Sequence, residues 1–278
     1  MNKTTLKQQD DPKKIRSSSV WLTDIHLDFL DESDKETLYS DIRNQKPERI
    51  FISGDIATGT TITDEMEHMA NALGLPIYFV LGNHDYYKSD FAQVNASIFL
   101  LCKNNCNLIW MREAGIIPLS TSTALIGHEG WADGGYGDFI GSTVQLTDYI
   151  LIESLKACPT RELLHQKLRE LGQQSAKFTE KMLCRAFTEF DSAILLTHVP
   201  PFREDCLYQN RPSNDEWAPH FSNRSMGEML TRIMLDHKDK NLTVLCGHTH
   251  HLSKNKILPN LEVLVGTATY GAPEIQPW

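Results

Sequence analysis

The first hundred residues alternate between short apolar runs and longer segments in which apolar residues recur at helical spacing. The apolar runs, rich in Val, Ile, Phe and Leu, predict three β-strands at 19–22, 49–53 and 76–81. A segment with helical periodicity follows each run. Alternation of this kind predicts βαβ units around a sheet whose ligands bind beyond the carboxyl ends of the strands.

Start and stop signals locate the three helices that follow these strands. Ser33 and Glu36 have the spacing of a capping box that opens the first helix. Gly74 ends the second helix, because glycine adopts the left-handed backbone of a helix C-terminus without a steric penalty. Ser89 is a candidate N-cap for the third helix, which we expect to run to about Asn104.

The pattern changes after the third helix. Apolar runs at 107–111, 115–119 and 124–127 have no helices between them and predict a β-meander or stacked hairpins. A glycine-rich loop at 130–141 follows, and then a helical stretch at 147–189. The remaining signals predict strands at 193–196, 242–246 and 261–265 and a helix at 225–237.

We expect a single folded domain. Residues 1–16 are polar and predict a disordered arm, and residues 17–278 predict one domain with a helical insertion at about 147–190. No internal repeat, low-complexity tract or linker rich in Pro and Ser divides the chain.

Composition narrows the class of protein. The hydrophobic residues, 41% of the chain, are sufficient for a sizeable core, and no apolar run approaches the roughly 18 residues of a membrane span. The polar N-terminus lacks the apolar stretch of an export signal, so we expect a cytoplasmic protein whose six cysteines are reduced. The net charge of −9, without a basic stripe, argues against binding of a long nucleic acid.

Five short polar motifs directly follow predicted strands. They are Asp24-Ile25-His26, Gly54-Asp55, Gly82-Asn83-His84-Asp85, Thr197-His198 and Gly247-His248-Thr249-His250. In an extended backbone residues i and i+2 point the same way, so Asp24 is expected to converge with His26, and His248 with His250. The glycines allow the chain to turn sharply at the strand ends.

The residue types in these motifs indicate a metal site. Two Asp, one Asn and four His form a mixed nitrogen and oxygen ligand set without a thiolate, which suits Mn, Fe, Co, Ni or Zn. Seven ligands are too many for one catalytic ion that keeps an open position. Two ions about 3.5–4 Å apart that share a bridging carboxylate fit the set, and such pairs are a common device for phosphoryl hydrolysis.

These motifs resemble the signature of the calcineurin-like metallophosphoesterase superfamily: D-x-H, G-D, G-N-H-[DE], H and G-H-x-H, in that order. The resemblance spans residues 24 to 250. It implies an α/β fold built as a four-layer αββα sandwich of two mixed β-sheets flanked by helices, with the metal site at the carboxyl ends of the strands. It also implies two divalent or mixed-valence transition-metal ions, for which we expect Mn, Fe or Zn.

The resemblance also implies a role for each motif residue. It makes Asp24, His26 and His250 ligands of the first metal, Asp55 the bridge, and Asn83, His198 and His248 ligands of the second metal. His84 would contact the substrate phosphate and protonate the leaving oxygen. Asp85 would hydrogen-bond to His84, fix its tautomer and favour the imidazolium.

The implied activity is hydrolysis of a small phosphomonoester or nucleotide-type phosphodiester by attack of a metal-bound hydroxide. Thr58-Gly59 stands where phosphoprotein phosphatases of the superfamily have Asp-Arg, and Thr58 replaces the metal-binding tyrosine of purple acid phosphatases. The sequence therefore matches neither the phosphoprotein phosphatases nor the purple acid phosphatases well. Two alternatives stay open, a manganese-dependent nuclease and a non-catalytic binding scaffold. We expect a small phosphorylated substrate, no membrane partner, and an oligomeric state that the sequence does not define.

Selectivity is expected to come from loops around the metals. One is the aromatic, glycine-rich loop at 130–139, and the other is the loop at 200–223, which leaves the strand that ends in His198. Together with the residues beside the motifs they provide four candidate substrate-binding residues: Arg203, Trp217, Tyr86 and His251. Tyr87 is a further candidate for stacking. The alternative interpretation is that the loop aromatics only anchor long loops to the body.

Overall fold

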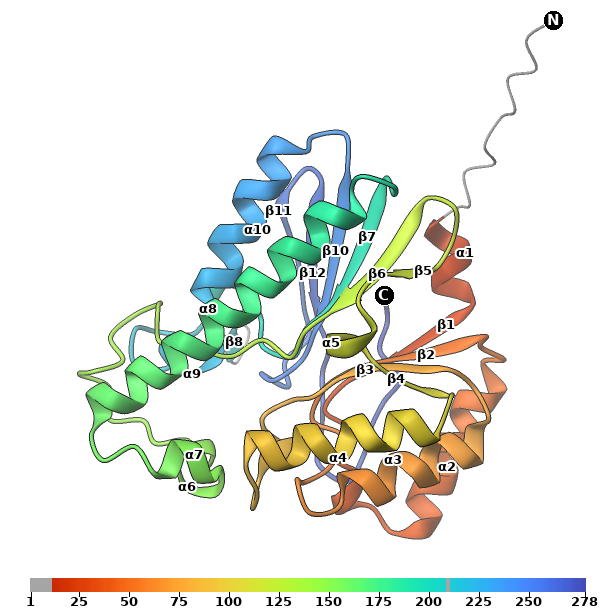
Figure 1. Cartoon of the computed structure of the whole chain (residues 1–278), viewed down its shortest axis with the longest axis horizontal. Coiled ribbons are helices and arrows are strands. Elements are labelled where there is room, and N and C mark those ends of the chain that lie inside the picture. Colours follow the sequence, from red (N-terminus) through yellow and green to blue (C-terminus); the bar gives the residue numbers. More distant parts are fainter. Residues whose placement is uncertain (1–11, 209–210) are drawn as a thin grey trace, which may run out of the picture.

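Two β-sheets packed face to face form the centre of the computed structural model, which describes residues 12–208 and 211–278 (Figure 1). The first sheet has the order β1-β2-β3-β4, and every neighbouring pair is parallel. Its strands are β1 (Ser19–Leu22), β2 (Arg49–Ser53), β3 (Ile77–Val80) and β4 (Leu108–Trp110). Their register aligns Val20 with Ile50, Ile50 with Ile77, and Ile77 with Leu108.

The second sheet has the order β11-β12-β10-β7-β6-β5. Its four central strands are parallel to one another, and the edge strands β11 and β5 are antiparallel to their neighbours. The strands are β5 (Ile117–Pro118), β6 (Thr123–Gly127), β7 (Ser192–Leu196), β10 (Asn241–Cys246), β11 (Ser253–Leu258) and β12 (Leu261–Val265). A separate two-stranded hairpin consists of β8 (Leu207–Tyr208) and β9 (Arg211–Pro212).

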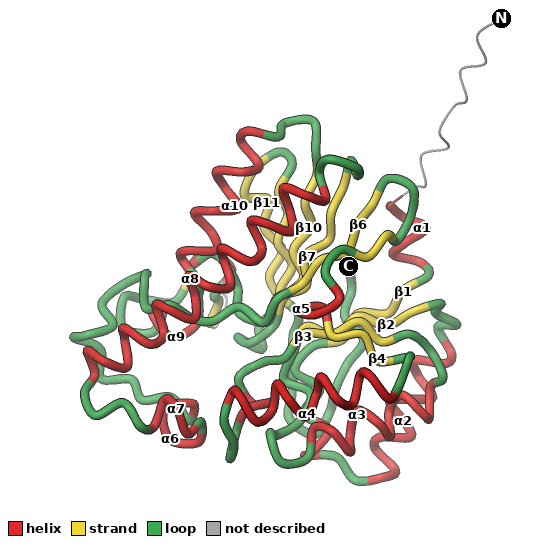
Figure 2. Tube along the Cα trace, in the orientation of Figure 1, coloured by secondary structure: helices red, strands yellow, loops and turns green. Residues whose placement is uncertain are grey.

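Helices cover the outer face of each sheet (Figures 1 and 2). The first sheet carries α2 (Glu32–Asn44), α3 (Ile62–Leu73) and α4 (Phe91–Asn104), and the second carries α8 (Arg161–Ala186) and α10 (Arg224–Asp236). The short elements are α1 (Pro12–Ser17), η1 (Leu27–Phe29), η2 (His84–Tyr86), α5 (Met111–Ala114), α6 (Asp148–Leu151), α7 (Glu153–Lys156), η3 (Arg203–Asp205) and α9 (Ala218–Phe221). The αββα fold class is therefore confirmed, except that the first sheet is parallel throughout and not mixed.

The central strands are largely apolar on both faces because each sheet is covered on both sides, whereas the edge strand β11 is polar and partly exposed. In the first sheet Val20, Ile50 and Phe79 face the helices, whereas Trp21 and Phe51 face the second sheet. This alternation follows the two-residue period of a strand. The core between the sheets also holds Leu196, Leu245 and Leu264 from the second sheet.

Two helix starts differ from the sequence prediction. The N-cap of α2 is Asp31, whose Oδ1 accepts hydrogen bonds from the backbone N–H groups of Ser33 and Asp34, both at 2.9 Å. The N-cap of α4 is Asp90 and not Ser89. In both cases a carboxylate lies close to the predicted serine, and its charge adds to the hydrogen bond at the positive end of the helix.

The predicted meander is wrong in its pairing. β4 joins the first sheet beside β3, whereas β5 and β6 form a hairpin in the second sheet. α5 connects these two parts of the chain. Apolar alternation identifies a strand but does not identify its partner, so the sequence could not divide these runs between two sheets.

The predicted disordered arm is wrong for residues 12–16. They form most of α1, and Ile15 packs into the core between the sheets near Trp278, the last residue of the chain. Residues 1–11 lie outside the described residues.

Candidate metal centre

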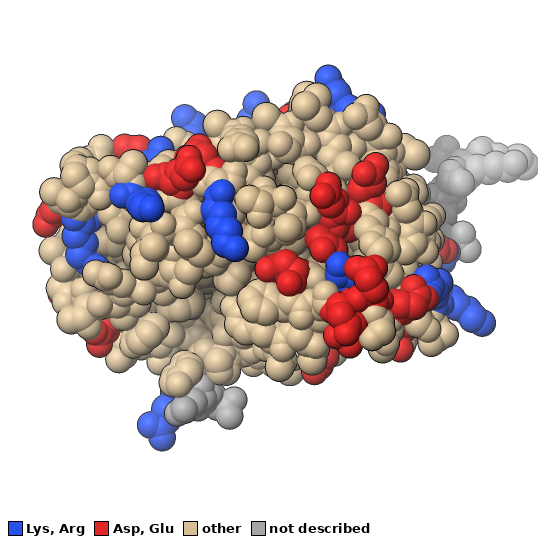
Figure 3. Space-filling view, turned by 90° about the horizontal axis from the view of Figure 1, so that it is seen from below, with Lys and Arg blue, Asp and Glu red and all other residues tan. Residues whose placement is uncertain are grey.

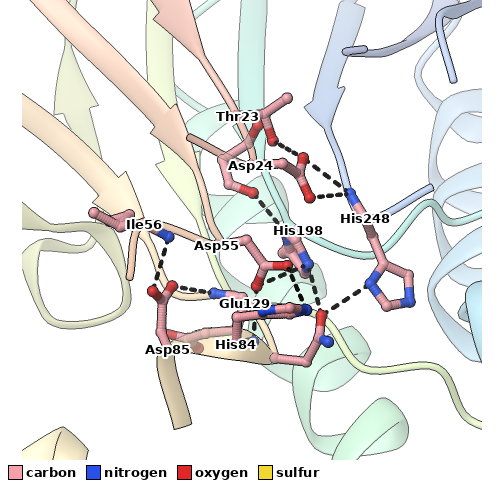
Figure 4. A network of polar contacts seen from close by, with 12 residues as sticks. Thr23, Asp24, Asp55, Ile56, His84, Asp85, Glu129, His198 and His248 are labelled. Atoms are coloured by element: carbon pink, nitrogen blue, oxygen red, sulfur yellow. Dashed lines mark hydrogen bonds and ion pairs between the residues drawn. The ribbon is translucent and has the colours of Figure 1, made fainter. Parts of the chain in front are cut away.

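Polar motifs from both sheets meet where five parallel strands end (Figure 4). Asp24 follows β1, Asp55 follows β2 and Asn83 follows β3, all in the first sheet. His198 follows β7 and His248 follows β10, in the second sheet. The site therefore bridges the two sheets at their carboxyl ends.

The backbone at this site is unusual. Among the described residues other than glycine, seven have a positive φ. Five of them are motif residues: Asp24, His26, Asp55, His248 and His250. The left-handed region costs free energy for such side chains, and clusters of it mark functional sites. The side chains therefore converge through a left-handed backbone, and the extended backbone predicted from the sequence is wrong.

One half of the site is a group of four side chains: Asp24, His26, Asp55 and His250. Each contributes one ligand atom, and these four atoms lie within 4.8 Å of one another. His250 Nε2 is 3.3 Å from Asp24 Oδ1 and 3.4 Å from His26 Nε2. His26 Nε2 is 4.0 Å from Asp55 Oδ2.

The other half of the site lies around Asn83 Oδ1. This oxygen is 2.9 Å from both His198 Nε2 and His248 Nδ1. His198 Nε2 is also 3.4 Å from Asp55 Oδ1. The two oxygens of Asp55 thus face different halves, an arrangement that allows the carboxylate to bridge two ions.

The imidazoles are oriented by backbone carbonyls. His198 Nδ1 lies 2.9 Å from the Ser53 carbonyl oxygen, and His248 Nε2 lies 3.3 Å from the His220 carbonyl oxygen. A ring N–H that donates to each carbonyl leaves a lone pair on the opposite nitrogen, which points at Asn83 Oδ1. Lone pairs of His198, His248, Asn83 and Asp55 then face one another. A cation among them removes this repulsion, so the donor set fits a metal ion.

The protonation states also suit metal binding. Burial lowers the pKa of His26 to about 4 and that of His248 to about 3, so both rings are neutral near pH 7. Burial, together with the charges of Asp24 and Asp85, raises the pKa of Asp55 well above its usual value. Ionised Asp55 is therefore destabilised in the metal-free protein, and divalent cations supply the missing positive charge.

Two glycines keep room for these groups. A Cβ on Gly82 would overlap the carboxylate of Asp55, and a Cβ on Gly247 would overlap the carboxylate of Asp24. The Asp24 carboxylate accepts hydrogen bonds from Thr23 Oγ1 at 2.6 Å and from the His248 backbone N–H at 3.0 Å. Glycine at these two positions therefore allows the carboxylates to approach the strand ends closely.

His84 lies at the edge of the site. Its backbone N–H donates to Asp55 Oδ1 at 2.9 Å, and its Nε2 is 3.9 Å from Asp55 Oδ2. The imidazole stacks on the ring of Tyr87 with centroids 4.2 Å apart. Burial, reinforced by the charges of His26 and His198, lowers the pKa of His84 to about 2.

The predicted partnership of Asp85 with His84 is wrong. Asp85 Oδ1 accepts a hydrogen bond from the Ile56 backbone N–H at 2.8 Å (Figure 4). It also accepts one from the Ala57 backbone N–H at 2.8 Å, and Oδ2 accepts one from the Gly82 backbone N–H at 2.7 Å. The Asp85 carboxylate thus fixes the backbone that directly follows Asp55. The imidazolium form of His84 gains no support from it.

This placement gives a stability prediction. Asp85→Ala leaves three buried N–H groups unpaired, at a cost of about 3 kcal/mol or more in the free energy of unfolding. We expect a melting temperature lower by about 6–12 °C in differential scanning calorimetry. Asp85→Asn retains one acceptor and is expected to recover part of this loss. A pH–rate profile shifted as in a variant of His84, with unchanged stability, would instead indicate a partner of His84.

A cavity of about 760 Å³ opens over the site. Its floor includes Asp55, Asn83, His84 and His248. Its walls are largely aromatic or apolar, and come from Tyr87, Leu146, Leu207, Tyr208, Trp217, Phe221 and Tyr270. Arg211 lines the cavity as well.

Two of the four predicted substrate-binding residues lie in this cavity. Trp217 and His251 are among its described lining residues, and Tyr87 lines it too. Arg203 and Tyr86 are absent from that lining. Arg203 donates to the Ser213 carbonyl at 2.8 Å and to Asp215 at 2.6 Å, so it holds its own loop.

Tyr86 is a core residue. It is 1% exposed and donates a hydrogen bond to Asn95 Oδ1 at 2.9 Å. In the aromatic, glycine-rich loop Trp131 and Phe139 are likewise buried, whereas Tyr136 is half-buried and lines a different hollow. For the buried residues the anchoring interpretation is the correct one.

Several residues of the cavity wall were not among the four substrate-binding residues selected from the sequence, and Arg211, Asp148 and Tyr270 are three of them. Arg211 lies in the predicted loop, but the loop offered two arginines and no signal to choose between them. Tyr270 lies beyond the last motif, and its ring centroid is 4.6 Å from that of His26. Asp148 begins α6 and contacts Asn83. No sequence pattern connects the last two residues to the motifs.

The αββα sandwich, with nitrogen and oxygen donor atoms gathered at the strand ends, fits the class of two-metal hydrolases. Residues 19–252 match the model of the family described as calcineurin-like phosphoesterase, and the chain belongs to this family. It is therefore a binuclear metal-dependent phosphohydrolase.

Solved structures agree on the fold. The chain is similar to a phosphopantetheinyl hydrolase from Mycobacterium tuberculosis, with a TM-score of 0.63 and 14% identity over 91% of this chain and 89% of that one. It is also similar to a dimetal phosphatase from Danio rerio, with a TM-score of 0.56 and 12% identity over 91% and 87% of the two chains. No curated protein sequence gives a significant match. In the described part of the chain, no helix has the length and apolarity that crossing a membrane requires.

Proposed function

We propose that the chain hydrolyses a small phosphomonoester or a nucleotide-type phosphodiester at a site that holds two transition-metal ions. Asp24, His26 and His250 would hold the first ion, and Asn83, His198 and His248 the second, with Asp55 between them. The observation that carries this assignment is Asp55, whose two oxygens face the two halves of the site at 4.0 and 3.4 Å. The ligand set is without thiolate and favours Mn, Fe or Zn.

The residues around the ions have distinct tasks. When bound, the ions supply positive charge for the phosphate and activate a water molecule as the nucleophile. His84 lines the cavity next to Asp55, which supports a role in which it would contact the phosphate and transfer a proton to the leaving oxygen. An anionic phosphate beside the ring favours its protonation and opposes the effect of burial.

The cavity supports a small substrate with a ring or an apolar group. Its volume lies in the range of about 300–1,000 Å³ that is usual for small-molecule sites. Among the described lining residues Arg211 is the one Lys or Arg, so it is the one permanent positive side-chain charge that the lining offers beyond the metals. Acidic side chains gather at the end of the molecule that holds α2 and α3 (Figure 3), which opposes a nucleic-acid track there.

The test is an activity screen with Mn, Fe, Zn and Co. The substrates are p-nitrophenyl phosphate, its bis-ester, cyclic nucleotides, dinucleotides, and single- and double-stranded DNA. We expect turnover of at least one small ester, dependent on added metal and abolished by a chelator. Inactivity with every small ester, or degradation of DNA alone, would contradict the proposed substrate class.

Variants of the cavity wall test the substrate-binding part of the proposal. Trp217→Ala and Arg211→Ala remove a ring and a charge from the wall, and we expect each to raise KM by about 3–10-fold, since such contacts contribute roughly 0.5–1.5 kcal/mol. Matched controls are Leu235→Ala and Arg232→Ala on α10, which line a different hollow. Equal KM values for the wall variants and the controls would contradict a role of this wall in binding.

A further inference from the structure

A buried carboxylate outside the five motifs contacts one of the proposed metal ligands. Asp148 is 5% exposed and is the first residue of α6, in the helical insertion. Its Oδ1 accepts a hydrogen bond from Asn83 Nδ2 at 2.9 Å and another from the Tyr87 hydroxyl at 2.6 Å. Asn83 Nδ2 is also 3.3 Å from the Tyr87 hydroxyl oxygen.

The position of Asp148 is fixed by backbone pairing. The Lys88 N–H donates to the Leu151 carbonyl at 2.8 Å, and the Glu153 N–H donates to the Ser89 carbonyl at 3.0 Å. These bonds join the insertion to the chain directly after Tyr87. Asp148 is therefore held against the motif that contains Asn83.

The orientation of the Asn83 amide decides whether it can bind a metal. An amide has an oxygen with lone pairs on one side and an NH₂ group on the other. In the observed orientation the oxygen faces His198 and His248, and the NH₂ group faces Asp148. The reverse orientation would point N–H groups at the metal position and place the amide oxygen against the Asp148 oxygen.

Asp148 also reaches the edge of the site through Tyr87. The Tyr87 hydroxyl donates a hydrogen bond to Asp148, and the Tyr87 ring stacks on His84 with an interplanar angle of 29°. One carboxylate thus contacts the partner of His84 as well as Asn83. Neither contact requires Asp148 to touch a metal or the substrate.

We propose that Asp148 is a positioning residue that selects the orientation of the Asn83 amide and thereby sets the affinity of the second metal position. The helical insertion supplies this residue, and its docking is therefore linked to assembly of the metal centre. The proposal rests on the assignment of Asn83 as a ligand. Groups that orient ligands in this way typically contribute about 10–100-fold in metal affinity.

The test measures metal binding and not turnover. Mn²⁺ is titrated by isothermal calorimetry into the metal-free full chain and into three variants: Asp148→Ala, Asp148→Asn and Glu153→Ala. Electron paramagnetic resonance of the samples at two equivalents separates coupled Mn²⁺ pairs from isolated ions. Glu153→Ala is the matched control, because it removes an exposed carboxylate of the same insertion.

We expect the wild type and Glu153→Ala to bind two ions and to give the coupled signal. Asp148→Ala is expected to weaken the second ion by about 10–100-fold, with the first ion unaffected and an isolated Mn²⁺ signal. Asp148→Asn is expected to restore most of this affinity, because its carbonyl oxygen can accept the same two hydrogen bonds.

Two results would overturn the proposal. The first is wild-type affinity for both ions in Asp148→Ala. The second is weak binding of the second ion by Asp148→Asn. If folded Asp148→Asn binds this ion as weakly as Asp148→Ala, the effect comes from charge and not from orientation of Asn83. If Asp148→Asn binds weakly because it is unfolded, the effect comes from folding. A wild type that binds fewer than two ions would instead reject the ligand assignment itself and the inference with it.

Discussion

Replacing Asp55 with Asn is expected to reduce turnover by about 10³-fold or more and to leave fewer than two metal ions per chain. The side chain keeps its shape, but it loses the negative charge shared between the two halves of the site, and the amide NH₂ group cannot ligate. A 10³-fold loss in rate corresponds to about 4 kcal/mol in the activation free energy, because each 1.36 kcal/mol changes the rate tenfold. We attribute this loss to weaker binding of the metals and weaker stabilisation of the transition state. The measurements are kcat/KM and metal content after dialysis.

Stability separates this effect from misfolding. Burial and nearby carboxylates raise the pKa of Asp55 above its unfolded value, so its ionised form destabilises the metal-free fold at pH 7. Asp55→Asn removes that charge, and we expect the metal-free variant to melt no lower than the metal-free wild type. Asp41→Asn, at an exposed position of α2, is the matched control. An Asp55→Asn protein with two ions and normal turnover would refute the bridge.

His84→Ala is expected to retain both ions and to lose about 10²–10⁴-fold in kcat, the usual contribution of a positioned acid–base group. The side chain lies 3.9 Å from the bridging carboxylate and outside the four-residue ligand cluster, so its removal should leave metal binding intact. Activity and metal content are measured on the same preparations.

The leaving group distinguishes proton transfer from simple phosphate binding. An alkyl alkoxide needs a proton to depart, whereas p-nitrophenolate hardly does. The loss on His84→Ala should therefore be larger for an alkyl phosphate than for a p-nitrophenyl ester. Losses of the same size for both substrates would indicate that His84 binds the phosphate without donating a proton.

Much of the fold was predictable because the central strands of the two sheets are buried on both faces. The runs at 19–22 and 49–53 have apolar centres, 20–22 and 50–52, and predict strands clearly. The run at 107–111 was just as clear as a strand, yet its partner was not, because pairing is decided by a connection of a few residues through α5. The predicted helix starts differ by two residues in α2 and by one residue in α4, because a neighbouring aspartate caps each helix instead of the serine.

The residues of the candidate site also divide into those that the sequence could place and those that it could not. Residues at strand ends were predictable, because parallel strands bring their carboxyl ends to one edge. Side-chain direction within a turn was not: Tyr86 and Tyr87 are adjacent, yet the first enters the core and the second lines the cavity. Asp85 could not be placed either, since its partners are backbone groups created by the turn that it stabilises.

Contacts between distant segments were beyond reach from the sequence. Asp148 lies 65 residues from Asn83, and Tyr270 lies beyond the segment that matches the family. Both reach the site because helices or loops return to it, and one sequence carries no pattern for such a return. The sequence could not distinguish Arg211 from Arg203. In the structure the Arg203 guanidinium donates hydrogen bonds to the Ser213 carbonyl and to Asp215.

The most direct test of the two-metal assignment is a crystal of the full chain soaked in Mn²⁺ and measured by anomalous scattering. We expect two peaks about 3.5–4 Å apart, with Asp55 between them. One peak should lie among Asp24, His26 and His250, and the other among Asn83, His198 and His248. A single peak, or two peaks that do not share Asp55, would contradict the assignment.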